Sequence, residues 1–165
     1  SGEHNFKNYV CAILAATKGG LTIEQSIDSL KKFKGVKRRM DLVADVSNIK
    51  VFDDFAHHPT AIKMSSNAIK DKHPTKKILG IVELGSNTMS SGYHKDNLIE
   101  SLKILDKTLL LDHNNAYDYL NRFDSEEKML DCIRTEILEY DIILIMTNKD
   151  SQKFIQPILD SLEKK

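Results

Sequence analysis

The stretch that decides the fold is KILGIVEL, residues 77–84, an almost continuous apolar run of strand length. Two similar runs follow, TLLL at 108–111 and DIILIM at 141–146, and helical patterns separate the three. Strands that are apolar on both faces belong to a parallel sheet that helices cover on both sides. Residues from about 41 onward are therefore predicted to form an α/β domain, Rossmann-like in the broad sense.

The entry to this domain is predicted to be a β-hairpin. Leu42, Ala44 and Val46 alternate with Asp41, Val43 and Asp45. A second run extends from 48 to 55, and Ser47-Asn48 supplies the turn. Helices are predicted over 59–72, 95–105, 126–138 and 152–163. Pro157 either kinks the last helix or marks its true start.

Residues 1–40 carry two helical patterns of their own. Apolar residues at helical spacing fill 8–17 before Gly19-Gly20, and Thr22 with Gln25 forms a capping box for a helix to about Lys32. A basic loop over 33–39 follows. We therefore assign 1–40 to the end of a preceding domain and 41–165 to the α/β domain. Because the chain starts without Met and directly in a helical pattern, we expect it to be part of a longer polypeptide.

The composition limits the class of protein. The chain has 165 residues, of which 41% are hydrophobic, and 24 Lys+Arg balance 24 Asp+Glu. This composition allows a real core, and the absence of a basic excess argues against a general nucleic-acid binder. The longest apolar run is too short to cross a membrane, so we expect a cytoplasmic protein. Cys11 and Cys132 form no CxxC pair, and we expect both to be buried thiols.

The segment DDFAHHPTAI, residues 53–62, places two acids and two histidines after a strand. Adjacent histidines such as His57 and His58 point to opposite faces of a strand, so they rarely bind one metal together. Ligands of open α/β sheets bind beyond the carboxyl ends of the strands, and an aspartate there commonly accepts from both hydroxyls of a ribose. The alternative is that Asp53 or Asp54 caps the helix or the turn.

Three further groups have both a ligand-binding and an ordinary interpretation. His4, Asn5 and Asn8 start the first helix and suit either the edge of an adenine or a plain cap. Residues 37–39, Lys-Arg-Arg, suit phosphate or are simply solvated. Residues 83–89, ELGSNTM, follow a strand and form either a binding loop or a plain one. The chain has no GxxxxGK[ST] and no GxGxxG, so it lacks the usual means of holding a triphosphate.

Four segments occur together in one family. GEHNFKNYVCAILAA (2–16), GVKRRMD (35–41), VFDDFAHHPTAI (51–62) and ELGSNTMSSGYH (83–94), in this order, resemble the Mur ligases. The resemblance covers most of residues 2 to about 105. It implies an enzyme of three domains: one binds a UDP-sugar, the central one carries the P-loop and the magnesium ligands, and the third closes over ATP. This chain is then similar to the tail of the central domain followed by the whole third domain.

The resemblance also implies roles for individual residues. Asn5 and Asn8 would contact adenine with His4 beside them, Arg39 would support the transferred phosphate, and Asp54 would hold the ribose. A second set would face the peptide substrate or the reaction centre: His57, His58, Ser86, Asn87 and Thr88.

The reaction that the resemblance implies is formation of an amide bond. ATP with Mg²⁺ phosphorylates a muramyl carboxylate, and an amine attacks the acyl phosphate. The sequence SNTM favours a member that joins the L-Ala-γ-D-Glu-meso-diaminopimelate tripeptide to UDP-N-acetylmuramate in peptidoglycan recycling. The alternatives are a member that adds L-alanine, or a non-catalytic nucleotide-binding module. The metal ligands are expected mainly in the missing central domain, none in this chain, and this part alone is expected to be inactive.

One position departs from the family pattern. Glu-Pro-Arg is expected before SNTM, whereas this chain has Glu83-Leu84-Gly85. If that arginine contacts carboxylates of the peptide, another cation must replace it, either Lys95 or one of the lysines near Lys76.

Overall fold

The computed structural model of the chain describes residues 3–33 and 35–163, with side chains from residue 6 onward. The chain divides into two compact units, residues 1–36 and residues 37–165. In the part of the chain that is described, no helix is long and apolar enough to cross a membrane.

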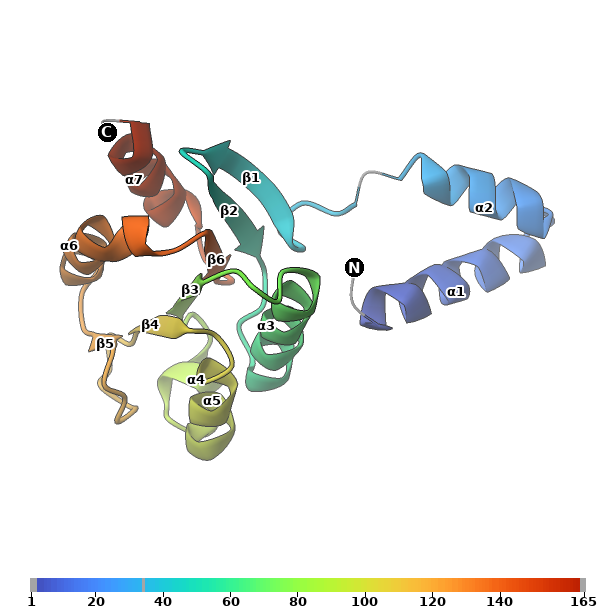
Figure 1. The fold of residues 1–165 in the computed structure, drawn as a ribbon. Coiled ribbons are helices and arrows are strands. Elements are labelled where there is room, and N and C mark those ends of the chain that lie inside the picture. The colour runs from blue at the N-terminus through green and yellow to red at the C-terminus, as the bar shows by residue number, and fades with distance from the viewer. Residues whose placement is uncertain (1–2, 34, 164–165) are drawn as a thin grey trace. The chain divides into compact units, whose positions relative to one another are not determined.

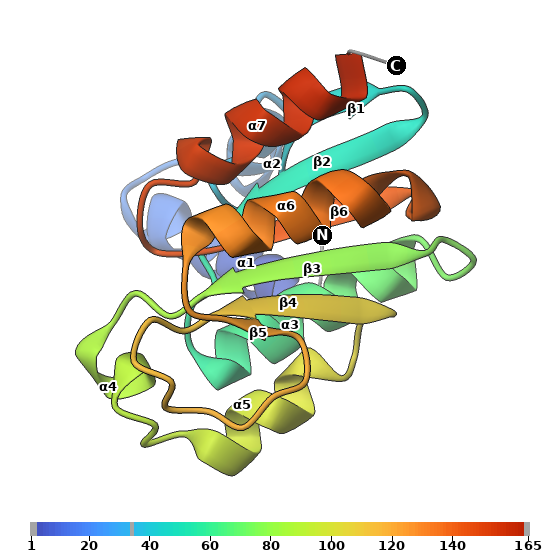
Figure 2. The same ribbon diagram turned by 90° about the vertical axis from the view of Figure 1, so that its left-hand side faces the viewer.

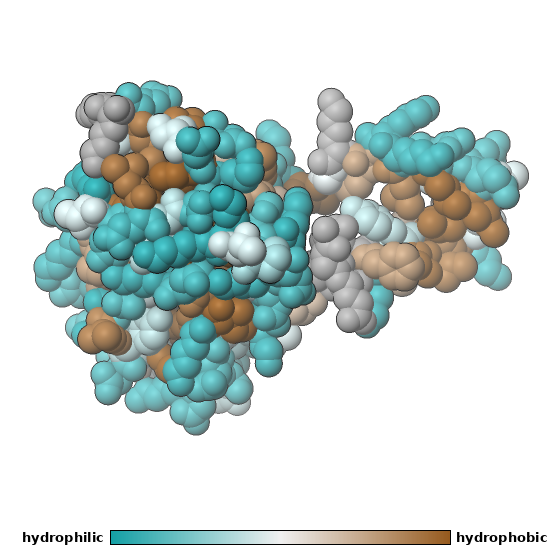
Figure 3. Space-filling model, viewed as in Figure 1, coloured by the Kyte–Doolittle hydropathy of each residue, from teal (hydrophilic) through white to brown (hydrophobic). Residues whose placement is uncertain are grey.

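The first unit consists of two helices, α1 (Glu3–Lys18) and α2 (Ile23–Lys31). The predicted capping box is confirmed, because Thr22 Oγ1 accepts from Gln25 N at 3.1 Å and Gln25 Oε1 accepts from Thr22 N at 2.9 Å. Many apolar side chains of this unit are exposed, as the brown surface in Figure 3 shows. Cys11 is among the exposed residues of α1, so the expectation of a buried thiol there is wrong.

The second unit is built on one six-stranded sheet (Figure 1). The hairpin β1–β2 is antiparallel, and all the other strand pairs are parallel. The predicted α/β class with a mostly parallel sheet and a hairpin entry is therefore confirmed. In spatial order the strands are β1 (Asp41–Val46), β2 (Ile49–Asp54), β6 (Ile142–Met146), β3 (Ile78–Glu83), β4 (Lys107–Leu111) and β5 (Arg122–Phe123).

Helices cover both faces of this sheet, as Figure 2 shows. One face packs against α6 (Glu126–Glu136) and α7 (Gln152–Glu163), and the other against α3 (Pro59–Lys72) and α5 (Lys95–Leu102). Along β6, Ile143 and Ile145 belong to the first core, whereas Leu144 and Met146 belong to the second. A strand between two cores must be apolar on both faces, which explains the unbroken run that the sequence shows.

Several elements differ from the expectation. The short helix α4 (Asn87–Ser90) and the two-residue strand β5 were not predicted. Pro157 lies inside α7 and is not its start. The helix predicted over 126–138 ends at Glu136, and a 3-10 helix, Ile137–Glu139, follows it. The hairpin turn follows the prediction, since Ser47 and Asn48 have φ of 52° and 65°, as a two-residue turn of the left-handed kind requires.

Candidate functional site

The predicted ligand-binding segments meet where the parallel strands end. Asp54 ends β2, Glu83 ends β3, and Thr147 follows β6, which lies between them. We call this side of the sheet the carboxyl edge. Parallel neighbours bring the loops that follow them to the same edge, so segments 53–58 and 83–89 lie at one place in the fold.

Asp54 holds the turn at this edge together. Its carboxylate accepts hydrogen bonds from Met40 N at 2.7 Å, Ala56 N at 2.8 Å and Ser65 Oγ at 3.0 Å. The residue is only 3% exposed. This geometry matches the capping alternative for the segment. A carboxylate has about four acceptor sites, so one remains, and the role of Asp54 in holding a ribose stays a prediction.

The basic loop is anchored to the carboxyl edge by Arg38. Its Nε lies 3.3 Å from Asp53 Oδ2, and its Nη2 donates to Thr147 O at 2.7 Å. The next residue, Arg39, is exposed, and its guanidinium lies 5.6 Å from the centre of the Phe55 ring. The guanidinium of Arg38 is thus occupied by contacts within the domain, whereas that of Arg39 is accessible to a ligand. The role of Arg39 in supporting a phosphate stays a prediction.

The two histidines of the turn have different surroundings. His57 donates from Nδ1 to Phe55 O at 2.9 Å. His58 is exposed, and its ring centre lies 4.5 Å from that of His94, which in turn lies 4.9 Å from the ring of Tyr93. The sequence reasoning missed His94 and Tyr93, which are far from His58 in the chain and follow the SNTM segment. The proposed contacts of His57 and His58 with substrate stay predictions.

The SNTM segment is a short helix with a buried anchor. Met89 is fully buried, and its carbonyl accepts from Tyr117 Oη at 2.7 Å. Ser86 caps the helix, with Oγ accepting from Met89 N at 3.4 Å. Asn87 and Thr88 remain exposed. The loop therefore presents small polar side chains at the carboxyl edge from a fixed base, as a binding loop needs.

An ion triad lies beside this loop, in which Glu83 is buried and Lys153 and Glu126 are partly exposed. Lys153 Nζ donates to Glu83 Oε1 at 2.6 Å and to Glu126 Oε1 at 2.5 Å, and Thr147 Oγ1 donates to Glu83 Oε2 at 2.6 Å. Burial lowers the pKa of Lys153, but its hydrogen bonds to the two glutamates raise that pKa above its ordinary value overall. The amine is therefore charged at neutral pH.

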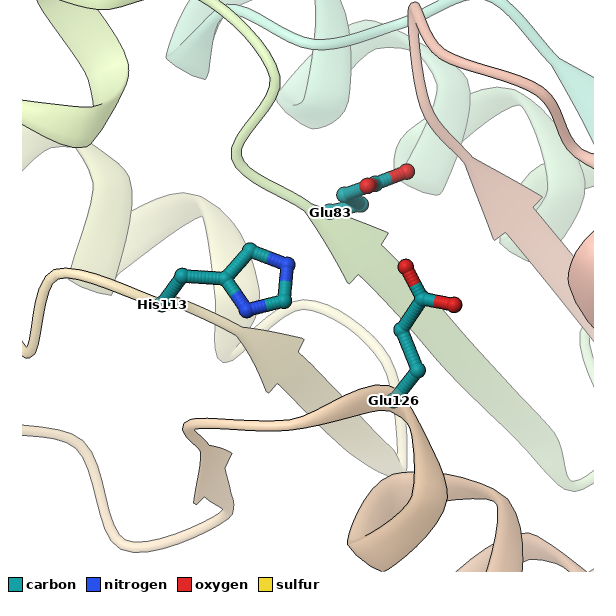
Figure 4. Close-up of side chains that lie close together, drawn as sticks. All are labelled: Glu83, His113 and Glu126. Carbon is teal, nitrogen blue, oxygen red and sulfur yellow. The ribbon is translucent and has the colours of Figure 1, made fainter.

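The same glutamates form a group with His113 that could hold a metal (Figure 4). Ligand atoms of Glu83, His113 and Glu126 lie within 4.8 Å of one another. However, the ammonium group of Lys153 already bonds to both carboxylates, so a metal would have to displace it. Among the described residues this cluster is therefore better explained as a lysine-centred ion triad.

The predicted adenine contacts belong to the first unit. His4 and Asn5 lie in the first turn of α1, and their side chains are outside the described part of the chain. Asn8 is exposed on the same helix. The assignment of these three residues to adenine stays a prediction.

Comparison with known proteins decides the family. The model of the "Mur ligase, glutamate ligase domain" matches residues 38–149. The chain belongs to the Mur ligase family. The UDP-N-acetylmuramate–L-alanyl-γ-D-glutamyl-meso-2,6-diaminoheptandioate ligase of Haemophilus influenzae is 34% identical over 99% of this chain and 39% of its own length. The corresponding ligase of Escherichia coli is 40% identical over 67% of this chain and 24% of its own length.

Solved structures agree with this assignment. A murein peptide ligase from Psychrobacter arcticus has a TM-score of 0.75 and 34% identity, over 98% of this chain and 37% of that protein. A separately crystallised domain of a Haemophilus ducreyi protein, assigned to the same ligase activity, has a TM-score of 0.62 and 27% identity, over 75% of this chain and 99% of that domain. The chain thus spans less than two fifths of the length of the Haemophilus influenzae and Psychrobacter arcticus ligases.

Proposed function

We propose that the chain is the C-terminal part of an ATP-dependent ligase that joins the L-Ala-γ-D-Glu-meso-diaminopimelate tripeptide to UDP-N-acetylmuramate, in the cytoplasm, for peptidoglycan recycling. The observation that carries the proposal is the 34% identity over 99% of the chain with a ligase whose name states this peptide and this nucleotide sugar. The arrangement at the carboxyl edge supports it, because the turn 53–58 and the loop 86–88 lie on neighbouring parts of one edge.

In this proposal ATP supplies the phosphoryl group that activates the muramyl carboxylate, with Mg²⁺ held mainly by residues outside this chain. The donors at the edge fit such a role only in part, since Arg38 is engaged by Asp53 and Thr147 whereas Arg39 is accessible. Arg39 would neutralise phosphate charge, and Asn87 and Thr88 would orient the peptide. These contributions are positioning and charge neutralisation, which account for most of the catalysis of phosphoryl transfer.

The second candidate is a ligase that adds L-alanine to UDP-N-acetylmuramate. The observation in its favour is that such a ligase from Hydrogenobaculum is 34% identical over 76% of this chain and 30% of its own length. A third candidate, a non-catalytic nucleotide-binding module, requires this chain to bind adenine nucleotides tightly by itself. We expect weak binding, because the chain contains no glycine-rich phosphate loop.

The deciding experiment follows ATP-dependent phosphate release by the full-length gene product with UDP-N-acetylmuramate. Either the tripeptide or free L-alanine is offered as the amine. Release with the tripeptide alone supports the proposal, and release with L-alanine alone assigns the protein to synthesis of new precursors. Release with neither amine, together with tight ATP binding by this chain alone, would favour the module.

A further inference from the structure

The position after Leu84 has no room for a side chain. An idealised Cβ on Gly85 would overlap Asn148 Oδ1, and it would lie 2.9 Å from Lys149 Cγ and 3.0 Å from Lys149 Cε. Real Cβ atoms do not approach heavy atoms closely enough to tolerate this set of contacts. The side chains that follow β6 therefore occupy the space into which a residue at position 85 would extend.

This packing bears on the one departure from the family pattern. Arginine is expected where the chain has Gly85, and the stem of Lys149 lies against that glycine. Because β3 and β6 are paired neighbours, with Val82 opposite Met146, the segments that follow them run side by side. A lysine from the segment after β6 can thus occupy the place where the family pattern has an arginine from the segment after β3.

Two other cations at the carboxyl edge are already engaged. Lys153 bonds to Glu83 and Glu126, and Arg38 is held by Asp53. Lys76 lies among the lysines that the sequence offers as a replacement. It pairs with Asp141 at 2.8 Å beside the start of β3, at the opposite end of the sheet. That part of the sequence-based expectation is wrong.

Lys149 is exposed, and it forms no ion pair with any residue that the structure describes. Its backbone is fixed, since Lys149 N donates to Thr147 Oγ1 at 3.0 Å, and that hydroxyl donates in turn to buried Glu83. The ammonium group of Lys149 is therefore attached to a fixed backbone at the carboxyl edge, next to the SNTM loop. A fixed backbone with an unpaired charge is what recognition of an anionic group requires.

We propose that Lys149 is a specificity-determining residue that binds a carboxylate of the peptide substrate, in place of the arginine of the family pattern. The inference rests on the proposed function, because the peptide named for the similar ligases carries free carboxylates on its glutamyl and diaminoheptandioate residues. An ammonium group is a point charge without the fixed fork of a guanidinium. This enzyme therefore tolerates a displaced or rotated carboxylate better than an arginine-containing relative does.

The test is steady-state kinetics of the full-length protein with UDP-N-acetylmuramate and ATP. The Lys149→Met variant should raise KM for the tripeptide roughly tenfold or more, with kcat changed little, because a charge-assisted hydrogen bond made in both ground and transition states is lost. Lys149→Arg should stay within about threefold of the native KM. Lys103→Met, which removes an exposed lysine paired with Glu100 on α5, is the matched control.

Two further arms identify the ligand group and the location. A tripeptide with amidated terminal carboxylates should bind the native protein more weakly than the unmodified tripeptide does. The Lys149→Met variant should bind the two peptides equally. The triple variant Gly85→Arg/Asn148→Ala/Lys149→Gly moves the charge to position 85 and removes the two side chains that a residue there would meet. It should recover most of the lost affinity. An unchanged KM in Lys149→Met, or a larger effect of Lys95→Met, overturns the inference. A native enzyme inactive with the tripeptide instead overturns the proposed function.

Discussion

Replacing Asp54 with alanine should destabilise the second unit by roughly 2–4 kcal/mol. The carboxylate accepts from three donors, and two of the hydrogen bonds, from Ala56 N and Ser65 Oγ, are buried. A buried donor that loses its partner costs about 1–3 kcal/mol. The third donor, Met40 N, is only part-buried, so water can replace the carboxylate there. Relief from burying a charge offsets part of the sum, which gives the stated range.

The measurement is urea unfolding of the chain followed by circular dichroism, with Ser65→Ala as the matched control. The control removes one donor together with its hydrogen bond, and it leaves the carboxylate with two partners, so it should cost only about 1 kcal/mol. If Asp54→Ala loses no more stability than Ser65→Ala, the carboxylate does not organise the turn, and the reasoning fails. The result also governs binding assays, because loss of nucleotide binding in Asp54→Ala reports a ribose contact only in protein that remains folded.

Three further predictions concern charges and packing. Lys153→Met should lower the free energy of unfolding in urea by roughly 2–3 kcal/mol, because Glu83 stays buried without its cation. The 23% exposure of the lysine side chain limits this loss. Adding Glu83→Gln should recover much of the lost stability. Hydrogen bonds from the Lys76 ammonium and the Lys77 amide lower the pKa of Asp141, so this stabilisation is complete above about pH 4 and is lost as the pH falls through the folded-state pKa. Asp141→Asn should therefore flatten the acid limb of thermal stability against pH, and an unchanged limb would refute the assignment. Gly85→Ala should lower the melting temperature, since its Cβ overlaps Asn148; an unchanged value would show that the neighbouring loop yields freely.

The sequence predicted elements well where local signals agree. Pro59 at the first helical position and lysines in the last turn delimit α3, and the prediction for this helix has the observed bounds. The strand order could not be predicted in this way. Strands β3, β4 and β6 are similar apolar runs, and no local sequence signal indicates which of them are neighbours in the sheet. Strand β5 has only two residues, too few for a period.

The candidate site was predictable in its segments but not in its contacts. Proline, aspartate and small polar residues after apolar strands indicate where ligands bind in α/β sheets. The partners of these residues come from distant parts of the chain: the ring of His94 meets that of His58 edge to face, Lys153 bonds to Glu83, and Lys149 packs on Gly85. Such pairs depend on strand order and register. They could be found only in the folded structure.

The central place of β6 has a consequence for how the protein is made. Of the six strands of this sheet, β6 leaves the ribosome last, yet it joins β2 to β3. Until residues 142–146 emerge, the hairpin and the β3–β4 pair have no strand between them, and the apolar edge of β3 stays unpaired. Such edges favour intermolecular pairing, and distant strand pairing slows folding. Nascent chains that stall before residue 142 should therefore depend on chaperones more than the completed protein does.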